Sequence, residues 1–373
     1  MNKIQFERLI KPLVKIYDEI ELELIRKIIF RIDDYDGVKG SLEWYLKKIT
    51  ELGTLDNEML LTLDTRKRNI KETLKIMLST ASKNRDYLDV LQGYYEKGLL
   101  EVNPVNIFNS VAVNRLVDNA LKDTEDIMQL INTKAIEGAK ESYMSILNKA
   151  YIETASGVYT YQEAIRNAIK DSSKAGITSV HYANGRSLGI ESVIRRDVIT
   201  RINKLVGDID LQNAEELGTD LVYVDQHLGA RTRTIYMKHD YEAHAEWQGM
   251  VYTLNPNNTN YDNFFEKTGY GEMLGLKGIN CYHNFRPFFE WEKIPEPINL
   301  EDNKKQYELL QQQRAYERKI RRYKREKEMF KNIDTEEYNK AKNKLNKVNK
   351  EYNNFLDDND LRRDYSREFI ATE

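Results

Sequence analysis

Four histidines and the only cysteine of the chain lie close together in the sequence: His227, His239, His244, Cys281 and His283. Imidazole nitrogen and thiolate sulfur are the ligands that zinc prefers, in a tetrahedral set of four. Cys281 and His283 form a close pair, and His227 and His244 could complete the set from elsewhere in a glycine-rich fold. The spacing matches no standard zinc finger, so histidines that only cap loops or lie partly buried remain the alternative.

The same window contains two arginines next to these histidines, in His227-Leu-Gly-Ala-Arg-Thr-Arg233. Arg231 and Arg233 are candidates for binding phosphate or carboxylate, because a guanidinium group can bind either with two parallel hydrogen bonds. The structural interpretation, which we favour, is that Arg231 donates to loop carbonyls and that Trp247 fills a small core.

Indications of catalysis in this window are few. His244 and Glu246 could act as the metal ligand and the base of a hydrolase. However, the sequence has no helical H-E-x-x-H spacing, no G-x-S-x-G elbow and no P-loop. Cys281 and His283 are too close in sequence for the usual cysteine–histidine catalytic pair. We therefore predict a protein that is not an enzyme; a metal-dependent enzyme acting on DNA is the alternative.

A basic run lies further along the chain and is opposed by only two acidic residues, Glu317 and Glu326. The chain as a whole has a net charge of -3, so any binding to nucleic acid requires a local patch of this kind. On a helix, positions 314, 318, 321 and 325 fall on one face. We predict contact with DNA or with an acidic protein surface, and the alternative is a solvated face. The run comprises Arg314, Arg318, Lys319, Arg321, Arg322, Lys324, Arg325 and Lys327.

Proline and glycine divide the chain into regions that must position these residues. No proline occurs from Val105 to Asn255, whereas Pro256, Pro287, Pro295 and Pro297 follow within a short distance. We predict a mainly α fold with three parts. These are a helical N-terminal region (1–150), a core module (helical over 151–217, compact and α+β over 218–297) and a charged helical tail (298–373).

Local patterns predict individual elements within these parts. An apolar stripe begins at Leu9 and recurs every three or four residues to Ile28, which indicates a buried helix face, and we expect about four helices before residue 150. Thr160 and Glu163 form a capping box. Asn184-Gly185 predicts a break, residues 187–217 a helix interrupted or kinked near Gly207, and Leu221–Val224 a strand.

The last part has a different composition from the rest. Residues 300–355 contain neither glycine nor proline and have only a sparse apolar stripe. They predict one long exposed or coiled-coil helix, followed by an end (357–373) that could be disordered. No stretch of the chain is long and apolar enough to be a secretory core or to span a bilayer, and one cysteine cannot form an internal disulfide. We therefore expect synthesis in a cytoplasm and no membrane partner.

Several motifs, in a fixed order over about residues 150–325, resemble the phage minor capsid protein 2 family. That resemblance marks Gly229, Arg231, Trp247, Gly249 and Asn280 as structural positions. The matching segments are Ala183-Asn-Gly-Arg186, Ile190-Glu-Ser-Val-Ile-Arg-Arg196, Thr200-Arg-Ile-Asn203, Ala214-Glu-Glu-Leu-Gly218, His227-Leu-Gly-Ala-Arg231, His244-Ala-Glu-Trp-Gln-Gly249, Gly269-Tyr-Gly271, Gly278-Ile-Asn-Cys-Tyr-His283, Pro287-Phe-Phe289 and Gln313-Arg-Ala-Tyr-Glu-Arg-Lys-Ile-Arg-Arg322.

The chain departs from the family pattern at two places that bear on the ligands. The related head-morphogenesis group often ends in G-x-N-C-R-[CH], whereas Tyr282 replaces the arginine here, which weakens a phosphate role at that position. Residues 234–243 look like an insertion, and His239 falls within it. Because the chain keeps the cysteine and histidine of the G-x-N-C-R-[CH] motif, the resemblance implies a zinc site formed by His227, His244, Cys281 and His283.

What the family resemblance implies about function is structural. Such proteins look like low-copy components of the procapsid and of the head interior of the virion, assembled in the host cytoplasm. Their expected partners are the portal protein, the major capsid or scaffolding protein and double-stranded DNA. An assembly chaperone that is absent from the finished particle is an alternative. Related proteins are sometimes fused to ADP-ribosyltransferases, but the C-terminal remainder here is too short and too charged for such a domain.

Overall fold

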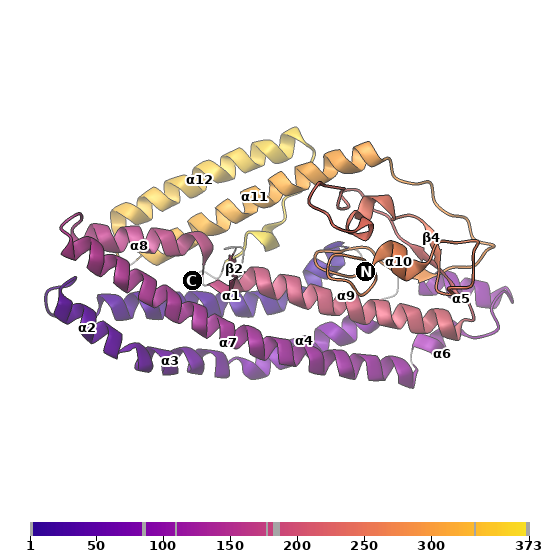
Figure 1. The fold of residues 1–373 in the computed structure, drawn as a ribbon, viewed down its shortest axis with the longest axis horizontal. Coiled ribbons are helices and arrows are strands. Elements are labelled where there is room, and N and C mark those ends of the chain that lie inside the picture. The colour runs from indigo at the N-terminus through magenta and orange to yellow at the C-terminus, as the bar shows by residue number, and fades with distance from the viewer. Residues whose placement is uncertain are drawn as a thin grey trace. The chain divides into compact units, whose positions relative to one another are not determined.

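The computed structural model describes residues 3–83, 87–108, 110–176, 178–181, 187–331 and 333–370, and it is mainly α-helical, as predicted (Figure 1). The α-helices are α1 (Lys3–Asp33), α2 (Leu42–Thr50), α3 (Leu52–Asp64), α4 (Lys67–Lys83), α5 (Leu88–Glu96), α6 (Pro104–Phe108), α7 (Val111–Ala155), α8 (Tyr161–Ala175), α9 (Ile190–Glu216), α10 (Phe264–Thr268), α11 (Leu300–Phe330) and α12 (Thr335–Asp358). The strands are β1 (Thr178–His181), β2 (Ser187–Gly189), β3 (Leu221–Val224), β4 (Val251–Thr253) and β5 (Phe285–Pro287), and the 3-10 helices are η1 (Asp240–Glu242), η2 (His244–Glu246) and η3 (Tyr365–Arg367).

The chain forms two compact units, and each is assembled from segments that are distant in sequence. Unit 1 comprises residues 1–10, 72–126 and 196–312, and unit 2 comprises residues 11–71, 127–195 and 313–373. Each unit therefore takes residues from all three parts that the sequence predicted. The predicted boundaries at 150 and 297 mark changes in composition, but they do not separate the two units.

The N-terminal region is helical, as predicted, but it contains more helices than expected. The apolar stripe of α1 is a core face, on which Leu13, Leu24 and Ile28 are buried. The described residues before 150 contain seven helices, α1 to α7, instead of about four. The extra breaks are not marked by proline. Glu51 alone separates α2 from α3, and two residues separate α3 from α4.

The predicted capping box at the start of α8 is confirmed. The Thr160 amide donates to Glu163 Oε2 at 2.9 Å, and the Glu163 amide donates to Thr160 Oγ1 at 3.3 Å. Downstream, residues 187–189 form strand β2, which pairs antiparallel with β1, so the predicted helix begins only at Ile190. The predicted break at Asn184-Gly185, like the motif Ala183-Asn-Gly-Arg186, lies outside the described residues.

Helix α9 runs without interruption through Gly207, where the sequence predicted an interruption or a kink. The glycine provides space there. A Cβ atom at residue 207 would lie 2.6 Å from the hydroxyl oxygen of Tyr270. Tyr270 reaches over this position and donates from that hydroxyl to Asp208 Oδ1 at 2.8 Å. Glycine in this helix therefore permits close packing of an aromatic ring, at the modest helix-propensity cost that glycine always carries.

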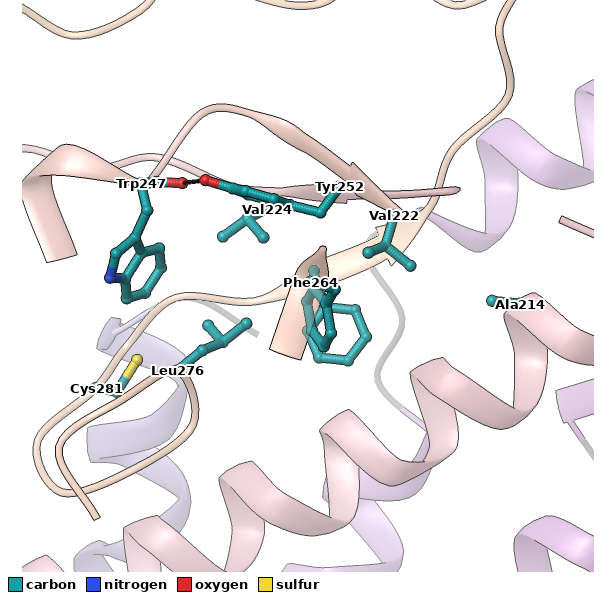
Figure 2. Packing of buried hydrophobic residues seen from close by; sticks show 9 residues of the cluster. Ala214, Val222, Val224, Trp247, Tyr252, Phe264, Leu276 and Cys281 are labelled. Atoms are coloured by element: carbon teal, nitrogen blue, oxygen red, sulfur yellow. Dashed lines mark hydrogen bonds between the residues drawn. The ribbon is translucent and has the colours of Figure 1, made fainter. Parts of the chain in front are cut away.

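The compact module (218–297) is built on a three-stranded sheet with the order β4-β3-β5, and the predicted strand Leu221–Val224 is its central strand. All four residues of β3 are buried, because the sheet has a core on each face. Val222 and Val224 pack on one side with Trp247 and Phe264 (Figure 2), and Leu221 and Tyr223 pack on the other. Alternation of side chains along a strand produces this division.

The charged tail is a helical hairpin rather than one long exposed helix. Helix α11 ends at Phe330 and α12 begins after Asp334, whose side chain accepts from the amide of Glu337 at 3.0 Å. The apolar residues Ile320, Val348, Tyr352 and Leu356 form a core between the two helices. The apolar stripe is sparse on α11 alone, and the core becomes sufficient only when Tyr352, Val348 and the leucines of α12 complete it.

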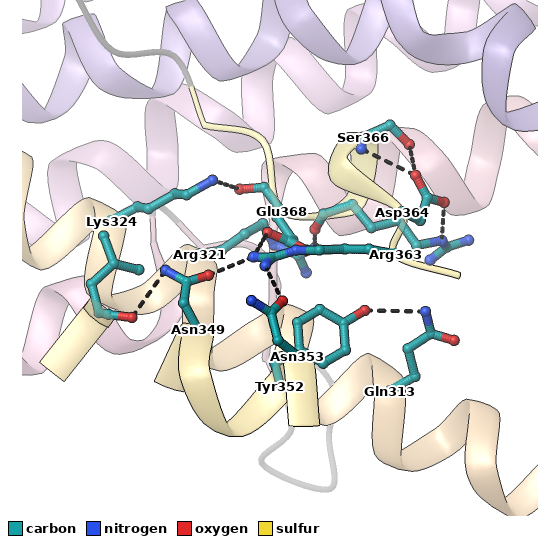
Figure 3. Close-up of polar contacts among 12 residues, drawn as sticks. Gln313, Arg321, Lys324, Asn349, Tyr352, Asn353, Arg363, Asp364, Ser366 and Glu368 are labelled. Carbon is teal, nitrogen blue, oxygen red and sulfur yellow. Dashed lines mark hydrogen bonds and ion pairs between the residues drawn. The ribbon is translucent and has the colours of Figure 1, made fainter. Parts of the chain in front are cut away.

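The end of the chain, predicted to be a candidate for disorder from residue 357, is ordered by contacts within unit 2 as far as it is described, to residue 370 (Figure 3). Arg363 binds both carboxylate oxygens of Glu368 at 2.6 Å. Lys324 of α11 donates to the carbonyl oxygen of Glu368 at 2.7 Å, and Arg321 donates to that of Arg367. Cations of the basic run thus hold this segment. Among the described helices, none is long and apolar enough to cross a membrane.

Replacement of Phe264 by alanine is expected to lower the unfolding free energy of the compact module by about 3–5 kcal/mol, because Phe264 is fully buried and its removal leaves a cavity. The neighbouring Phe265 is 44% exposed, so Phe265→Ala is the matched control and should cost much less. Hydrogen exchange of the β3 amides measures this local stability. Equal effects of the two substitutions would contradict the described core.

Candidate metal centre in the compact module

The topology of the sheet brings distant parts of the sequence to one place. Strand β3 pairs antiparallel with both β4 and β5, with Tyr223 opposite Val251 and Val224 opposite Phe285. The chain therefore leaves β3 at the same end of the sheet at which it enters β4 and β5. His227 follows β3, His244 precedes β4, and the Cys281–His283 pair precedes β5.

Three of the four residues predicted as metal ligands form a tight, buried cluster. His244, Cys281 and His283 can each place one ligand atom so that all three atoms lie within 4.8 Å of one another. None of the three side chains is more than 2% exposed. The Sγ atom of Cys281 lies 3.7 Å from Nδ1 of His283, and the ring of Trp247 packs against both histidines, with centroids 4.6 and 5.0 Å away.

Hydrogen bonds to carbonyl oxygens determine which nitrogen of each clustered histidine carries the proton. Nε2 of His244 lies 2.8 Å from the backbone oxygen of Leu274 and donates to it, because a carbonyl oxygen can only accept. Nε2 of His283 donates in the same way to Oε1 of Gln248 at 2.9 Å. That Gln248 atom is the oxygen, because it also accepts from the amide of His227 at 3.0 Å. Both histidines therefore carry their lone pair on Nδ1, and that of His283 faces Sγ of Cys281 at 3.7 Å.

His227, the fourth predicted ligand, lies beside the cluster and not within it. Its ring is stacked on that of His283, with centroids 4.2 Å apart and an interplanar angle of 25°. Nδ1 of His227 donates to the backbone oxygen of Leu228 at 3.1 Å. Its Nε2 is buried and has no hydrogen-bond partner within the part of the chain that the structure describes. An unpaired nitrogen of this kind is unusual, because buried polar atoms are nearly always hydrogen-bonded.

Burial sets the charge of the clustered residues. Desolvation lowers the pKa of His244 to about 3, and the nearby Arg231 guanidinium contributes in the same direction. Desolvation also places the pKa of His283 well below its ordinary value, and it raises that of the Cys281 thiol. At neutral pH the two imidazoles are neutral, which is the form that binds metals, and the thiol carries a proton until a cation replaces it.

The fifth residue of the original window, His239, lies apart from the cluster. It is exposed, and its ring stacks on Tyr241 with a centroid distance of 4.9 Å. The three clustered side chains are closed to solvent, and Glu246, the base of the hydrolase alternative, is paired with Arg233 at 2.5 Å.

The residues marked as structural positions hold the loops around the cluster. Arg231 donates to the carbonyl oxygens of Leu274, at 3.0 Å, and of Ile279, at 2.7 Å. Trp247 is buried in the core and donates from Nε1 to the carbonyl oxygen of Tyr241 at 2.8 Å. Gly229, Gly249 and Asn280 all have positive φ, at 82°, 74° and 57°, a region that favours glycine and tolerates asparagine.

Sequence reasoning did not identify the residues that orient the ligands. Gln248 binds His227 and His283 through one oxygen, and Asn203 of α9 donates to the carbonyl oxygen of Cys281 at 2.7 Å. Asn303 of α11 bonds both the amide and the carbonyl oxygen of Ala230, at 2.9 and 3.0 Å. Gln248 lies within the quoted motif His244–Gly249, but its residue type alone does not reveal this function.

The basic run is divided by the structure instead of forming one exposed face. Arg318 and Lys319 are exposed, whereas Arg321 and Lys324 bind the C-terminal segment and Arg325 lies 3.5 Å from Glu21. Arg314 and Arg322 are half-buried, and Arg322 lies over the ring of Tyr323. Positions 321 and 325 are therefore not free on the predicted cationic face, because Arg321 donates to the backbone of the C-terminal segment and Arg325 is paired with Glu21 of α1.

Comparison with known proteins shows first which class of proteins the chain resembles. The structural protein of Lactococcus phage LL-H is 26% identical over 364 residues, covering 93% of this chain and 94% of that protein. The structural protein of Lactococcus phage mv4 is 32% identical over 107 residues, covering 28% of this chain and 87% of that protein. Both relatives are structural proteins of phages, and no solved structure matches the chain.

A family match then makes the assignment specific. The profile described as Phage minor capsid protein 2 matches residues 1–357, nearly the whole chain. The chain belongs to the phage minor capsid protein 2 family. The match confirms the resemblance drawn from the motifs of residues 150–325 and extends it to the helical N-terminal region.

Substitution of Arg231 by lysine is expected to lower the unfolding free energy of the compact module by about 2 kcal/mol, because a lysine cannot hold both loop carbonyls with charged hydrogen bonds. Arg233→Lys is the control, since Arg233 binds exposed carboxylates and should change stability little. Urea unfolding measures both. A larger loss of stability from Arg233→Lys than from Arg231→Lys would contradict the role of Arg231 in holding the two loop carbonyls.

Proposed function

We propose that the chain is a minor component of a tailed-phage head that binds the portal protein and the capsid or scaffolding protein during assembly, and that it acts by binding and not by catalysis. Membership of the phage minor capsid protein 2 family over residues 1–357 is the observation that carries this proposal. The protein would be assembled in the host cytoplasm and lie inside the head of the virion. Its N-terminal helices would attach to the portal or capsid.

We further propose that the hairpin of α11 and α12 contacts packaged double-stranded DNA. Basic residues outnumber acidic ones over residues 313–370, although the whole chain has a net charge of -3. Arg318 and Lys319 on α11 and Lys347 and Lys350 on α12 are exposed cations. Exposed lysines and arginines bind the phosphate backbone without reading its sequence, which suits a protein that meets DNA of any sequence.

The combined substitution of Arg318 and Lys319 by glutamine should weaken binding to double-stranded DNA. It should also reduce the slope of log affinity against log salt concentration by about 2, because two phosphate contacts are lost. These two residues are better targets than Arg321, which holds the C-terminal segment. Fluorescence anisotropy with a DNA duplex at several salt concentrations measures the effect.

The matched control is the double substitution of Lys304 and Lys305 by glutamine, which removes the same charge from exposed positions of the same helix. The control should leave the salt slope unchanged. The DNA proposal fails if both double variants bind equally. If only the Arg318 and Lys319 variant then loses affinity for purified portal protein, the portal is the acidic partner of this surface.

Quantitative mass spectrometry of procapsids and mature virions, with and without the portal protein, tests the role in the particle. We expect a few copies per particle, which are lost when the portal is absent. Presence in procapsids but not in virions would identify an assembly chaperone instead. Absence from both particles would contradict a structural role in the head.

A further inference from the structure

We propose that the compact module binds one zinc ion through Nδ1 of His244, Nδ1 of His283 and Sγ of Cys281, and that Nε2 of His227 becomes the fourth ligand after rotation of its side chain. This inference is independent of the proposed role in the phage head. It rests on the positions of the four side chains and on the hydrogen bonds that fix them.

The first argument is the direction of the lone pairs. A histidine that merely fills a core uses its nitrogens for internal hydrogen bonds, whereas a metal ligand donates from one nitrogen and keeps the other free. His244 and His283 each donate from Nε2 to a carbonyl oxygen, of Leu274 and of the Gln248 side chain respectively, and Nδ1 of His283 faces the thiol of Cys281. Hydrogen bonds of this kind, from the nitrogen that does not bind the metal, orient the imidazoles of metal sites, and they are already formed here.

The second argument is distance. In a tetrahedral zinc site, Zn–S and Zn–N bonds of about 2.3 and 2.05 Å place sulfur and nitrogen about 3.6 Å apart. The separation of Sγ of Cys281 and Nδ1 of His283 is 3.7 Å, which is already that of one edge of the tetrahedron. One ligand atom from each of the three side chains lies within 4.8 Å of the other two, so small displacements of the side chains complete the three-ligand set.

The third argument concerns the fourth ligand. Nε2 of His227 is buried, has no hydrogen-bond partner among the described residues and belongs to a ring that already lies 4.2 Å from the ring of His283. Coordination would satisfy this nitrogen, and only the side-chain torsions of His227 need to change. The neighbouring Asp225 is a poorer candidate, because its carboxylate accepts from the amide and the side chain of Asn284 at 2.8 and 3.2 Å.

The surrounding charges are compatible with a zinc–thiolate pair. Lys277 and Arg231 lie close enough to favour the thiolate of Cys281, and the carboxylate of Asp225 lies close enough to Lys277 to interact with its charge. Binding one Zn²⁺ releases the thiol proton to solvent, so the centre gains one net positive charge. Soft thiolate and imidazole ligands favour zinc over magnesium or calcium, which prefer oxygen.

Such an ion would join the three loops at one end of the sheet and hold further contacts of the same unit. The carbonyl oxygen of Cys281 accepts from Asn203 of α9. The hydroxyl of Tyr282 donates to Glu7 of α1 at 2.9 Å, and its ring contacts that of Phe6. The role expected of the metal is therefore structural: it would stabilise a small module whose loops are long relative to its strands.

The experiment measures zinc in the full-length protein, purified without chelator, by elemental mass spectrometry. We expect about one zinc per chain in the wild type and in His239→Ala, the control histidine outside the cluster. Cys281→Ser should lose the metal. Gln248→Ala, which removes the acceptor of both the His283 ring and the His227 amide, should weaken zinc affinity by about 10- to 100-fold in competition with a chromophoric chelator.

Cobalt substitution and chelation keep the test decisive if Cys281→Ser fails to fold. Wild-type protein loaded with Co²⁺ should show a thiolate-to-metal charge-transfer band and the visible bands of a tetrahedral site. Removal of zinc should increase hydrogen exchange at residues 276–284, and zinc but not magnesium should reverse it. Zinc that is substoichiometric and lost on dialysis, or a cobalt spectrum without the thiolate band, would overturn the proposal. If His227→Ala retained zinc fully and with unchanged affinity, His227 would not be the fourth ligand.

Discussion

Strand β3 pairs antiparallel with β4 on one side and β5 on the other, and the local geometry of the compact module depends on this pairing. Because the two edge strands start where the central strand ends, three loops from different parts of the sequence meet at one end of the sheet. His227, His244 and His283 come together there although more than fifty residues separate the first from the last. The two cores of the sheet fix the register, since a shift by one residue would exchange Val222 and Val224 with Leu221 and Tyr223.

The hairpin of α11 and α12 shows how a highly charged sequence can still form a specific structure. Its core is small and partly aromatic, with Tyr316 stacked on Tyr352 at 5.3 Å. Charged groups complete the packing: Lys344 binds the buried Glu326 at 2.9 Å, and Arg363 binds the buried Glu368. A buried carboxylate requires such a partner, so part of the positive charge is committed internally. The cations that remain exposed are fewer than the sequence alone suggests.

Much of the secondary structure could be predicted from the sequence, because local patterns determine it. The stripe of α1, the capping box of Thr160 and Glu163 and the strand Leu221–Val224 depend on neighbours within a few residues. The kink predicted at Gly207 was wrong. Glycine is needed there because the ring of Tyr270, which lies far away in the sequence, packs against that position. The hairpin and the ordered C-terminal segment were missed for the same reason: α12 and Glu368 complete what α11 lacks.

The candidate metal centre could be predicted as a set of residue types but not as a geometry. The sequence placed His227, His244, Cys281 and His283 in one window, whereas only the fold distinguishes the three clustered side chains from the stacked His227. Gln248 could not be identified as the residue that orients two of them, because a glutamine between a tryptophan and a glycine has no distinctive spacing.

The division of the chain into two units from interleaved segments has a consequence for synthesis on the ribosome. Unit 1 needs residues 1–10 together with residues up to 312, and unit 2 needs residues 11–71 together with the C-terminal segment. Neither unit can be completed as a contiguous nascent fragment, so part of the apolar surface of each stays uncovered until its last segment has emerged. Contacts of such long sequence separation slow folding and expose the waiting surfaces to aggregation. A premature stop anywhere before the final hairpin therefore damages both units at once instead of removing one and sparing the other.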